Sequence, residues 1–190
     1  MLRFVSVLKA FLAFLAMPLG MAGAEKSEGS LTPPPRDVMA TYLLHFARLT
    51  TFPDTKPLLL NKEGKPEFRV VLVGDDPFGK FLDSVFEGEM VGGRPVSLLR
   101  IPADATLPDC HMVFFGKMEP ERQLSLLKEL MKKPTLCLGE GSNFLDLGMV
   151  GFREEATKVV FDVHQERILG VGMRLDSRLL RLARVVRRAH

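Results

Sequence analysis

Residues 68–83, FRVVLVGDDPFGKFLD, decide the fold class of this chain. The run Val70, Val71, Leu72 and Val73 is unbroken and apolar, and it ends at the turn residues Gly-Asp-Asp-Pro. A short apolar run bounded by turn residues predicts a strand buried on both faces, as in parallel sheets. Apolar residues then recur at helical spacing, and Asp76-Pro77 predicts an N-cap followed by a proline at the first helical position. Strand, acidic turn and helix form one unit of an α/β sheet.

Predicted strands and helices also alternate along the rest of the chain. We expect helices at residues 36–49, from residue 119 onward, at 174–188, and over a single turn at 143–147. We expect strands at residues 94–101, 110–115, 135–138, 149–152 and 158–163. The last two strands are joined by a charged turn, which is typical of an antiparallel hairpin. This order predicts an α/β three-layer sandwich around a mixed, mostly parallel sheet, with a C-terminal hairpin and helix.

Composition favours one globular domain. The chain has 190 residues, 46% of them hydrophobic and 26% charged, which is enough to build a core. The net charge is +3, and much of that excess lies at the two ends. We therefore expect no nucleic-acid partner.

The N-terminal 24 residues have the pattern of a signal peptide. Arg3 and Lys9 precede an apolar segment, and Ala22-Gly23-Ala24 is a small-x-small cleavage site. A membrane anchor is the alternative, but the uncharged run is short for a span. We predict a signal peptide over 1–24, a proline-rich leader over 25–35 and a single α/β domain over 36–190. Export places the mature chain in an oxidising compartment, the periplasm or the outside.

The acidic turn after the first strand allows two interpretations. Asp75 and Asp76 resemble the acidic pair that holds magnesium in receiver domains, but the strand at 110–115 ends in Gly116-Lys117, without a carboxylate. The simpler interpretation is a capped turn between strand and helix. The alternative is a small-ligand crevice beyond the carboxyl ends of the strands, formed by Asp75, Asp76 and Phe78.

Nothing in the sequence predicts catalysis or metal binding. The histidines at 45, 111, 164 and 190 are scattered and lack metal-ligand spacing. No serine lies in a nucleophile elbow. We therefore expect no catalytic residue, no metal and no cofactor.

The two cysteines are candidates for one disulfide, because exactly two cysteines in a secreted chain favour a bridge. Cys110 begins one predicted strand and Cys137 lies in another, with a single helix between them. A bridge requires Cα atoms within about 7 Å. The alternative is that both are small buried hydrophobic residues.

The C-terminal segment predicts an amphipathic helix. Its apolar stripe consists of Leu175, Leu179, Leu182 and Val186, at the spacing of a face packed on a sheet. Its other face carries Arg178, Arg181, Arg184 and Arg188. These arginines form either a solvated face or a basic ridge that docks an acidic partner or an anionic membrane.

Five stretches, taken together and in order, carry a resemblance to a known family. They are residues 38–53 (VMATYLLHFARLTTFP), 71–79 (VLVGDDPFG), 93–96 (GRPV), 110–116 (CHMVFFG) and 159–186 (VVFDVHQERILGVGMRLDSRLLRLARVV). The combination resembles YfiR/HmsC-type periplasmic proteins. The chain departs from the family pattern at His164, where asparagine is frequent, and at Phe52, where tryptophan is frequent.

The resemblance implies a non-enzymatic negative regulator. Such a protein binds the periplasmic sensor domain of an inner-membrane diguanylate cyclase and holds it inactive, which restrains cyclic-di-GMP synthesis and biofilm formation. An OmpA-like outer-membrane lipoprotein is a further expected partner, because it sequesters the repressor, and a homodimer is a candidate assembly. A periplasmic small-ligand sensor or solute-binding domain is the alternative from another functional class.

Overall fold

The computed structural model describes residues 33–141, 143–156 and 158–187. Its strands are β1 (Thr50–Thr51), β2 (Phe68–Val73), β3 (Met90–Val91), β4 (Arg94–Ile101), β5 (Met112–Phe115), β6 (Leu136–Glu140), β7 (Val150–Glu155), β8 (Lys158–His164), β9 (Arg174–Leu175) and β10 (Val185–Arg187). Its helices are α1 (Pro35–Arg48), α2 (Lys80–Phe86), α3 (Pro120–Leu130), the 3-10 turn η1 (Phe144–Asp146), α4 (Gln165–Gly170) and α5 (Ser177–Leu182). Within these residues no helix is long and apolar enough to span a membrane.

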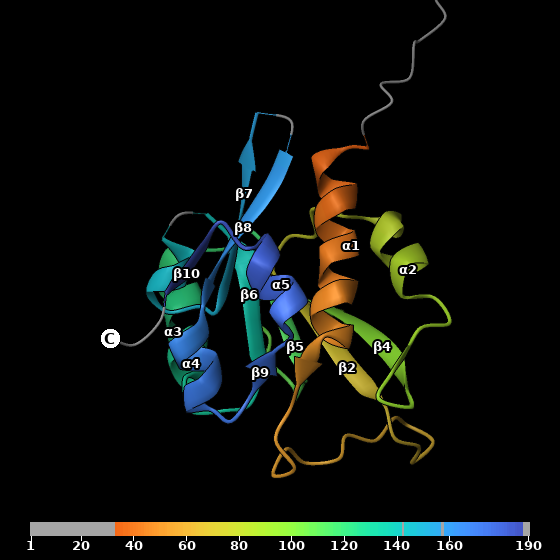
Figure 1. Ribbon diagram of the computed structural model, residues 1–190. Coiled ribbons are helices and arrows are strands. Elements are labelled where there is room, and N and C mark those ends of the chain that lie inside the picture. Colours follow the sequence, from red (N-terminus) through yellow and green to blue (C-terminus); the bar gives the residue numbers. More distant parts are fainter. Residues whose placement is uncertain (1–32, 142, 157, 188–190) are drawn as a thin grey trace, which may run out of the picture. The chain divides into compact units, whose positions relative to one another are not determined.

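Eight strands form one mixed sheet in the order β10-β8-β7-β6-β5-β2-β4-β3 (Figure 1). The strands from β4 through β2, β5 and β6 to β7 pair in parallel, whereas β3 with β4 and β7 with β8 pair antiparallel. Every residue of β5 is buried, as is every residue of β2 except Arg69. The apolar run at residues 70–73 is therefore part of a strand buried on both faces, as predicted. Strands covered on both faces lack the alternation of apolar and polar residues. A separate pair, β1 with β9, lies outside this sheet.

Helices cover both faces of the sheet, which confirms the predicted α/β sandwich. Phe114 and Phe115 are neighbours in β5 and therefore point to opposite faces. Phe114 contacts Phe78, which leads into α2, and Phe115 contacts Phe144 of η1. On the first face α1 packs beside α2 (Figure 1). On the second face residues of α3 and η1 line a shared surface pocket.

The single helix predicted at 174–188 is wrong. This segment forms β9, then α5, then β10, which pairs in parallel with β8. Asp176 caps α5 by accepting the backbone N–H of Arg178 at 2.8 Å, and Ala183 is extended and ends it. The flanking residues pair instead with strands distant in sequence, and Val185-Val186 has the β-branched side chains that favour a strand. Of the predicted apolar stripe Leu179 is buried, whereas Leu182 is 61% exposed.

Two smaller differences lie near helix starts. The Asp76 carboxylate accepts the backbone N–H groups of Phe78 (2.7 Å) and Gly79 (3.2 Å), as an N-cap does. α2 nevertheless begins at Lys80 rather than at Pro77, because Gly79 has a non-helical backbone with φ +55°. The short helix α4 has no counterpart among the predicted elements. The hairpin of β7 and β8 is confirmed, with Phe152 opposite Phe161.

Candidate ligand crevice at the carboxyl ends of the strands

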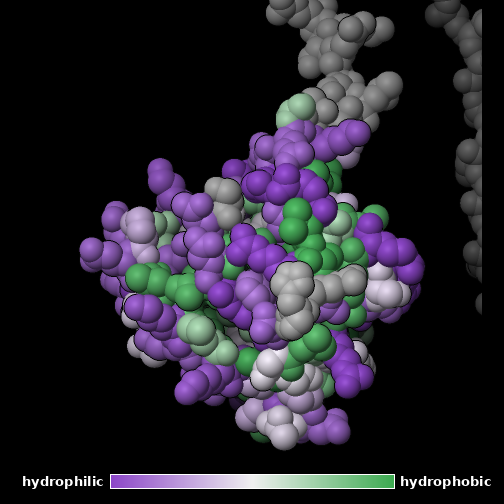
Figure 2. Space-filling model, turned by 60° about the vertical axis from the view of Figure 1, so that its left-hand side comes forward, coloured by the Kyte–Doolittle hydropathy of each residue, from purple (hydrophilic) through white to green (hydrophobic). Residues whose placement is uncertain are grey.

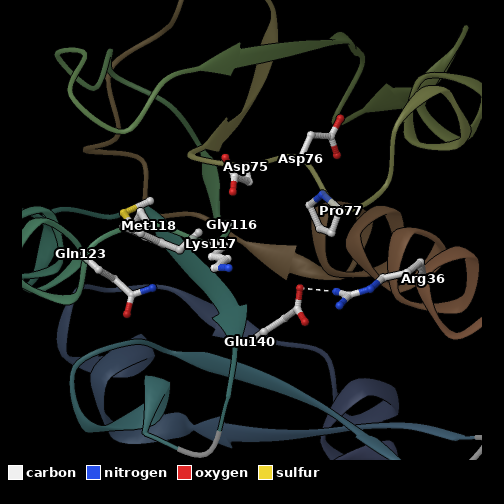
Figure 3. Close-up of a pocket in the computed structure, with 10 residues that line it drawn as sticks. Arg36, Asp75, Asp76, Pro77, Gly116, Lys117, Met118, Gln123 and Glu140 are labelled. Carbon is white, nitrogen blue, oxygen red and sulfur yellow. Dashed lines mark hydrogen bonds and ion pairs between the residues drawn. The ribbon is translucent and has the colours of Figure 1, made fainter.

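A cavity of about 460 Å³ lies at the carboxyl ends of β2, β5 and β6. Figure 3 shows the side chains around it. It is lined by residues that end or follow these strands or come from α1 and α3: Arg36, Asp75, Asp76, Pro77, Phe115, Gly116, Lys117, Met118, Gln123 and Glu140. A volume of this size suits a small metabolite.

The chain path places the cavity at a switch point of the sheet. From β2 the chain passes through α2 to β4 on one side, and then returns to β5 on the other side of β2. The connections after β2 and β5 thus diverge and leave a crevice between the two strand ends. Ligands of open α/β sheets bind at such points.

Two glycines allow the two strand ends to approach closely. The Asp75 N–H donates to the Lys117 carbonyl (3.1 Å), and the Gly116 N–H donates to the Val73 carbonyl (2.9 Å). A Cβ atom on Gly116 would lie 1.9 Å from the Asp75 carbonyl oxygen. Gly74 has φ +89°, a conformation that glycine adopts without strain. The sequences VGDD and FFGK therefore fix Asp75 and Lys117 side by side.

Three of the five charged side chains that line the cavity, Arg36, Asp76 and Glu140, are held in ion pairs. Arg100 donates to Asp76 (2.7 Å) and to Asp83 (2.7 Å), and these bonds, chiefly the one to Asp83, raise the pKa of its guanidinium. Arg36 forms an ion pair with Glu140, marked in Figure 3. Within the described residues the side chains of Asp75 and Lys117 form no ion pair or hydrogen bond.

The structure places two of the three predicted crevice residues at the cavity. Asp75 and Asp76 line it, but Phe78 is 7% exposed and packs on Phe114 with ring centroids 4.9 Å apart. Lys117 also lines the cavity but was not among the predicted site residues, although its position two residues after a buried strand was a usable signal.

The predicted arginine ridge is not one helical face. Arg178 pairs with Asp176 (2.9 Å), and this bond lowers the pKa of the Asp176 carboxyl to about 2. Arg184 lies beyond α5 and pairs with Asp162 (3.0 Å). Arg181 lies 3.4 Å from the Ser177 hydroxyl, and Arg188 is outside the described residues.

Cys110 and Cys137 are free, buried thiols in this structure. Strand pairing sets Cys137 beside Val113, three positions after Cys110. Burial raises the pKa of Cys110 to about 12 and also raises that of Cys137. In this arrangement the two cysteines are hydrophobic core residues.

We therefore expect no thiol to react in the folded protein and two thiols per chain to react after unfolding. The thiolate is the reactive form, and burial suppresses it. The measurement is alkylation of freshly isolated, non-reduced protein with and without urea, followed by mass spectrometry. An unfolded chain that takes up no label would establish the bridge instead.

His111 is a fully buried histidine held between two rings and two arginines. It stacks on Phe68 (4.5 Å between centroids) and meets Phe52 edge-on. Its Nδ1 accepts the backbone N–H of Arg69 at 3.1 Å, and the Arg94 guanidinium lies 3.1 Å from Nε2. Burial, followed by the charge of Arg94, lowers the pKa of His111 to about 3. The ring is therefore neutral at pH 7.

This burial makes stability depend on pH. The unfolded chain takes up a proton near pH 6.5 and the folded chain does not, so stability is complete above that pH and falls as the pH drops toward 3. Between pH 7.5 and 5.0 we expect His111 to account for a loss of about 2 kcal/mol. Urea unfolding of His111→Phe should lack this part of the loss, whereas exposed His45→Phe should retain it. Equal pH dependence in His111→Phe and the wild type would contradict the assignment.

A mixed sheet with helices on both faces and a crevice at its switch point defines an α/β sandwich domain. A family model described as YfiR/HmsC-like matches residues 36–184, so the chain belongs to the YfiR/HmsC-like family. The family is regulatory and non-catalytic, and its members are periplasmic and act in cyclic-di-GMP signalling. No curated protein matched the chain in a sequence search. Within the described residues no group of three or more histidine, cysteine or acidic side chains has the geometry to hold a metal ion.

Proposed function

We propose that this protein is a periplasmic negative regulator that binds the periplasmic sensor domain of an inner-membrane diguanylate cyclase. Binding restrains cyclic-di-GMP synthesis and thereby biofilm formation. The observation that supports this most is the family match, which extends over residues 36–184. Export by a signal peptide cleaved after Ala24 is part of the proposal.

The proposed mechanism is differential binding. A regulator shifts the equilibrium of a membrane sensor only by the difference between its affinities for the inactive and active states. The protein therefore has to bind the inactive state of the sensor more tightly. An OmpA-like outer-membrane lipoprotein would relieve repression by competing for the regulator. Self-association into a homodimer belongs to the same proposal and is measured by light scattering.

Exposed apolar side chains are available for contacts with a partner protein. On the face in Figure 2 hydrophobic side chains interrupt the hydrophilic surface. Three of the exposed residues are Leu169 of α4, Leu182 of α5 and Val185 of β10, which are 50%, 61% and 41% exposed. Arg181 lies one residue before Leu182, so apolar and basic groups adjoin on α5. Interfaces are frequently built from apolar cores with charged rims.

Deletion of the gene is expected to raise cellular cyclic-di-GMP, by about fivefold or more if the coupling is of ordinary allosteric size. The nucleotide is measured by mass spectrometry in the native host. A plasmid copy of the full chain should restore the low level, whereas a copy that lacks residues 1–24 should not. An unchanged or lower nucleotide level in the deletion strain would count decisively against a repressor.

A further inference from the structure

We infer that the crevice binds a small molecule that carries both a cationic amine and an anionic group, with the amine at Asp75 and the anion at Lys117. That this site is an effector site of a repressor rests on the proposed function. The binding itself does not.

Asp75 and Lys117 are solvent-exposed charged residues at the cavity, and their side chains have no partner within the described residues. Asp76 is held by Arg100, and Glu140 is held by Arg36. Asp75 and Lys117 are joined through their backbones but not through their side chains, within the part of the chain that the structure describes. Figure 3 shows the two on adjacent chain segments at the same cavity. A ligand with one positive and one negative group would match both, and charge-assisted hydrogen bonds are the strong ones.

The backbones of Asp75 and Lys117 are fixed against each other. The 1.9 Å approach of a Gly116 Cβ to the Asp75 carbonyl means that the two chain segments touch. The two exposed side chains therefore extend from backbone segments that are fixed against each other. A fixed backbone reduces the entropy lost when the chain binds a ligand.

The rest of the cavity wall supplies both apolar surface and a further polar group. Pro77, Phe115 and Met118 give it apolar surface, and Gln123 adds an amide that has no partner within the described residues. A pocket that combines apolar surface with polar groups that orient the ligand is typical of small-molecule sites. A single free ammonium does not match a polyphosphate, and no glycine-rich phosphate loop is present in the sequence.

The cavity also connects to the start of α1. Arg36 lies in the first turn of α1 and joins both Glu140 of β6 and, at 3.5 Å, Glu154 of β7. A ligand in the crevice lies against this ion pair. Occupancy would thus change how the first turn of α1 is held on the sheet, and that is the route by which an effector would act.

The test is a titration of the ¹⁵N-labelled protein with three bifunctional probes: γ-aminobutyrate, taurine and O-phosphoethanolamine. These share an amine and differ in the anion, so they separate carboxylate, sulfonate and phosphate recognition. Butyrate and butylamine carry one group each and serve as controls. We expect at least one bifunctional probe to shift the amide signals of residues 74–76 and 116–118 at millimolar concentration, and neither control to do so. No shift there from any of the three at 10 mM, or equal shifts from the controls, would overturn the inference.

Variants then assign the two contacts. Asp75→Asn and Lys117→Gln should each raise the Kd of the bound probe at least tenfold. Asp104→Asn and Lys62→Gln, at exposed positions away from the cavity, should leave it unchanged. Equal Kd values in all four variants would overturn the assignment. If the probe binds as expected but gene deletion leaves cyclic-di-GMP unchanged, the ligand site is supported and the repressor function is contradicted. If no probe binds but gene deletion raises cyclic-di-GMP, only the ligand site is contradicted.

Discussion

Phe152→Ala is expected to lower the free energy of unfolding by about 3–5 kcal/mol, the cost of removing a large aromatic side chain from a packed core. Phe152 is fully buried in β7 and faces α1. Its ring lies 5.9 Å from both Phe46 and Phe161, and 6.5 Å from Phe114 of β5. The residue thus joins α1, the hairpin and the central strands, so no single neighbour can move to fill the cavity.

The measurement is urea unfolding of the variant beside Phe81→Ala. Phe81 lies on α2 and is 39% exposed, so its replacement should cost less than about 1 kcal/mol. If Phe152→Ala does not fold, Phe152→Leu provides a smaller cavity and an intermediate loss. Similar losses in Phe81→Ala and Phe152→Ala would mean that the two rings have similar surroundings, contrary to the structure.

The central strands were predictable because short stretches of sequence indicate that they are buried. β2 and β5 are runs of consecutive apolar residues, and each run ends at a glycine followed by a charged residue. β7 and β8 were predictable as a hairpin because a charged turn separates two apolar runs. These signals depend on residues within about ten positions of one another, so they do not require knowledge of the fold.

The C-terminal segment was not predictable in the same way. Leucines at helical spacing from Leu175 onward indicate one helix. In the structure Leu175 pairs with Thr50, and Val185 pairs with Asp162. Strand partners so distant in the sequence leave no periodic pattern, and their backbone hydrogen bonds outweigh the local preference of a six-residue helix.

The crevice was predictable in part for the same reason. The rule that ligands bind at the carboxyl ends of strands identified Asp75 and Asp76 from the sequence around β2. The same rule could not identify Lys117 without the strand order, because only the pairing of β2 with β5 brings the carboxyl ends of these two strands together. Arg36 and Glu140 are separated by 104 positions, and no pattern in the sequence links them.

Asp162 lies beside β10, the strand that replaces the end of the predicted C-terminal helix. This carboxylate is 8% exposed in β8 and accepts hydrogen bonds from Arg153 (2.5 Å) and Arg184 (3.0 and 3.1 Å). Arg184 directly precedes β10, and its backbone N–H donates to the Phe161 carbonyl at 2.9 Å. Asp162 therefore holds the last strand to the sheet through a side chain, in addition to the backbone pairing of β10 with β8.

Asp162→Ala is expected to lower the free energy of unfolding by about 2–4 kcal/mol. Removal of one partner from a buried ion pair costs about 3–5 kcal/mol, and the 43% exposure of the Arg184 side chain reduces that cost by solvent screening. Arg153 would bear most of it, because its Nε is already buried without a partner within the described residues. Hydrogen exchange should report the loss first at the amides of Val185, Val186 and Arg187.

The matched control is Glu155→Ala. Glu155 is the other acidic partner of Arg184, at 3.4 Å, but its side chain is 49% exposed, so its removal should change stability by about 0.5 kcal/mol or less. Asp162→Asn keeps the shape and one acceptor oxygen and should fall between the two. If Asp162→Ala and Glu155→Ala lose the same stability and leave β10 equally protected from exchange, then Asp162 does not anchor the last strand, and backbone pairing alone holds it.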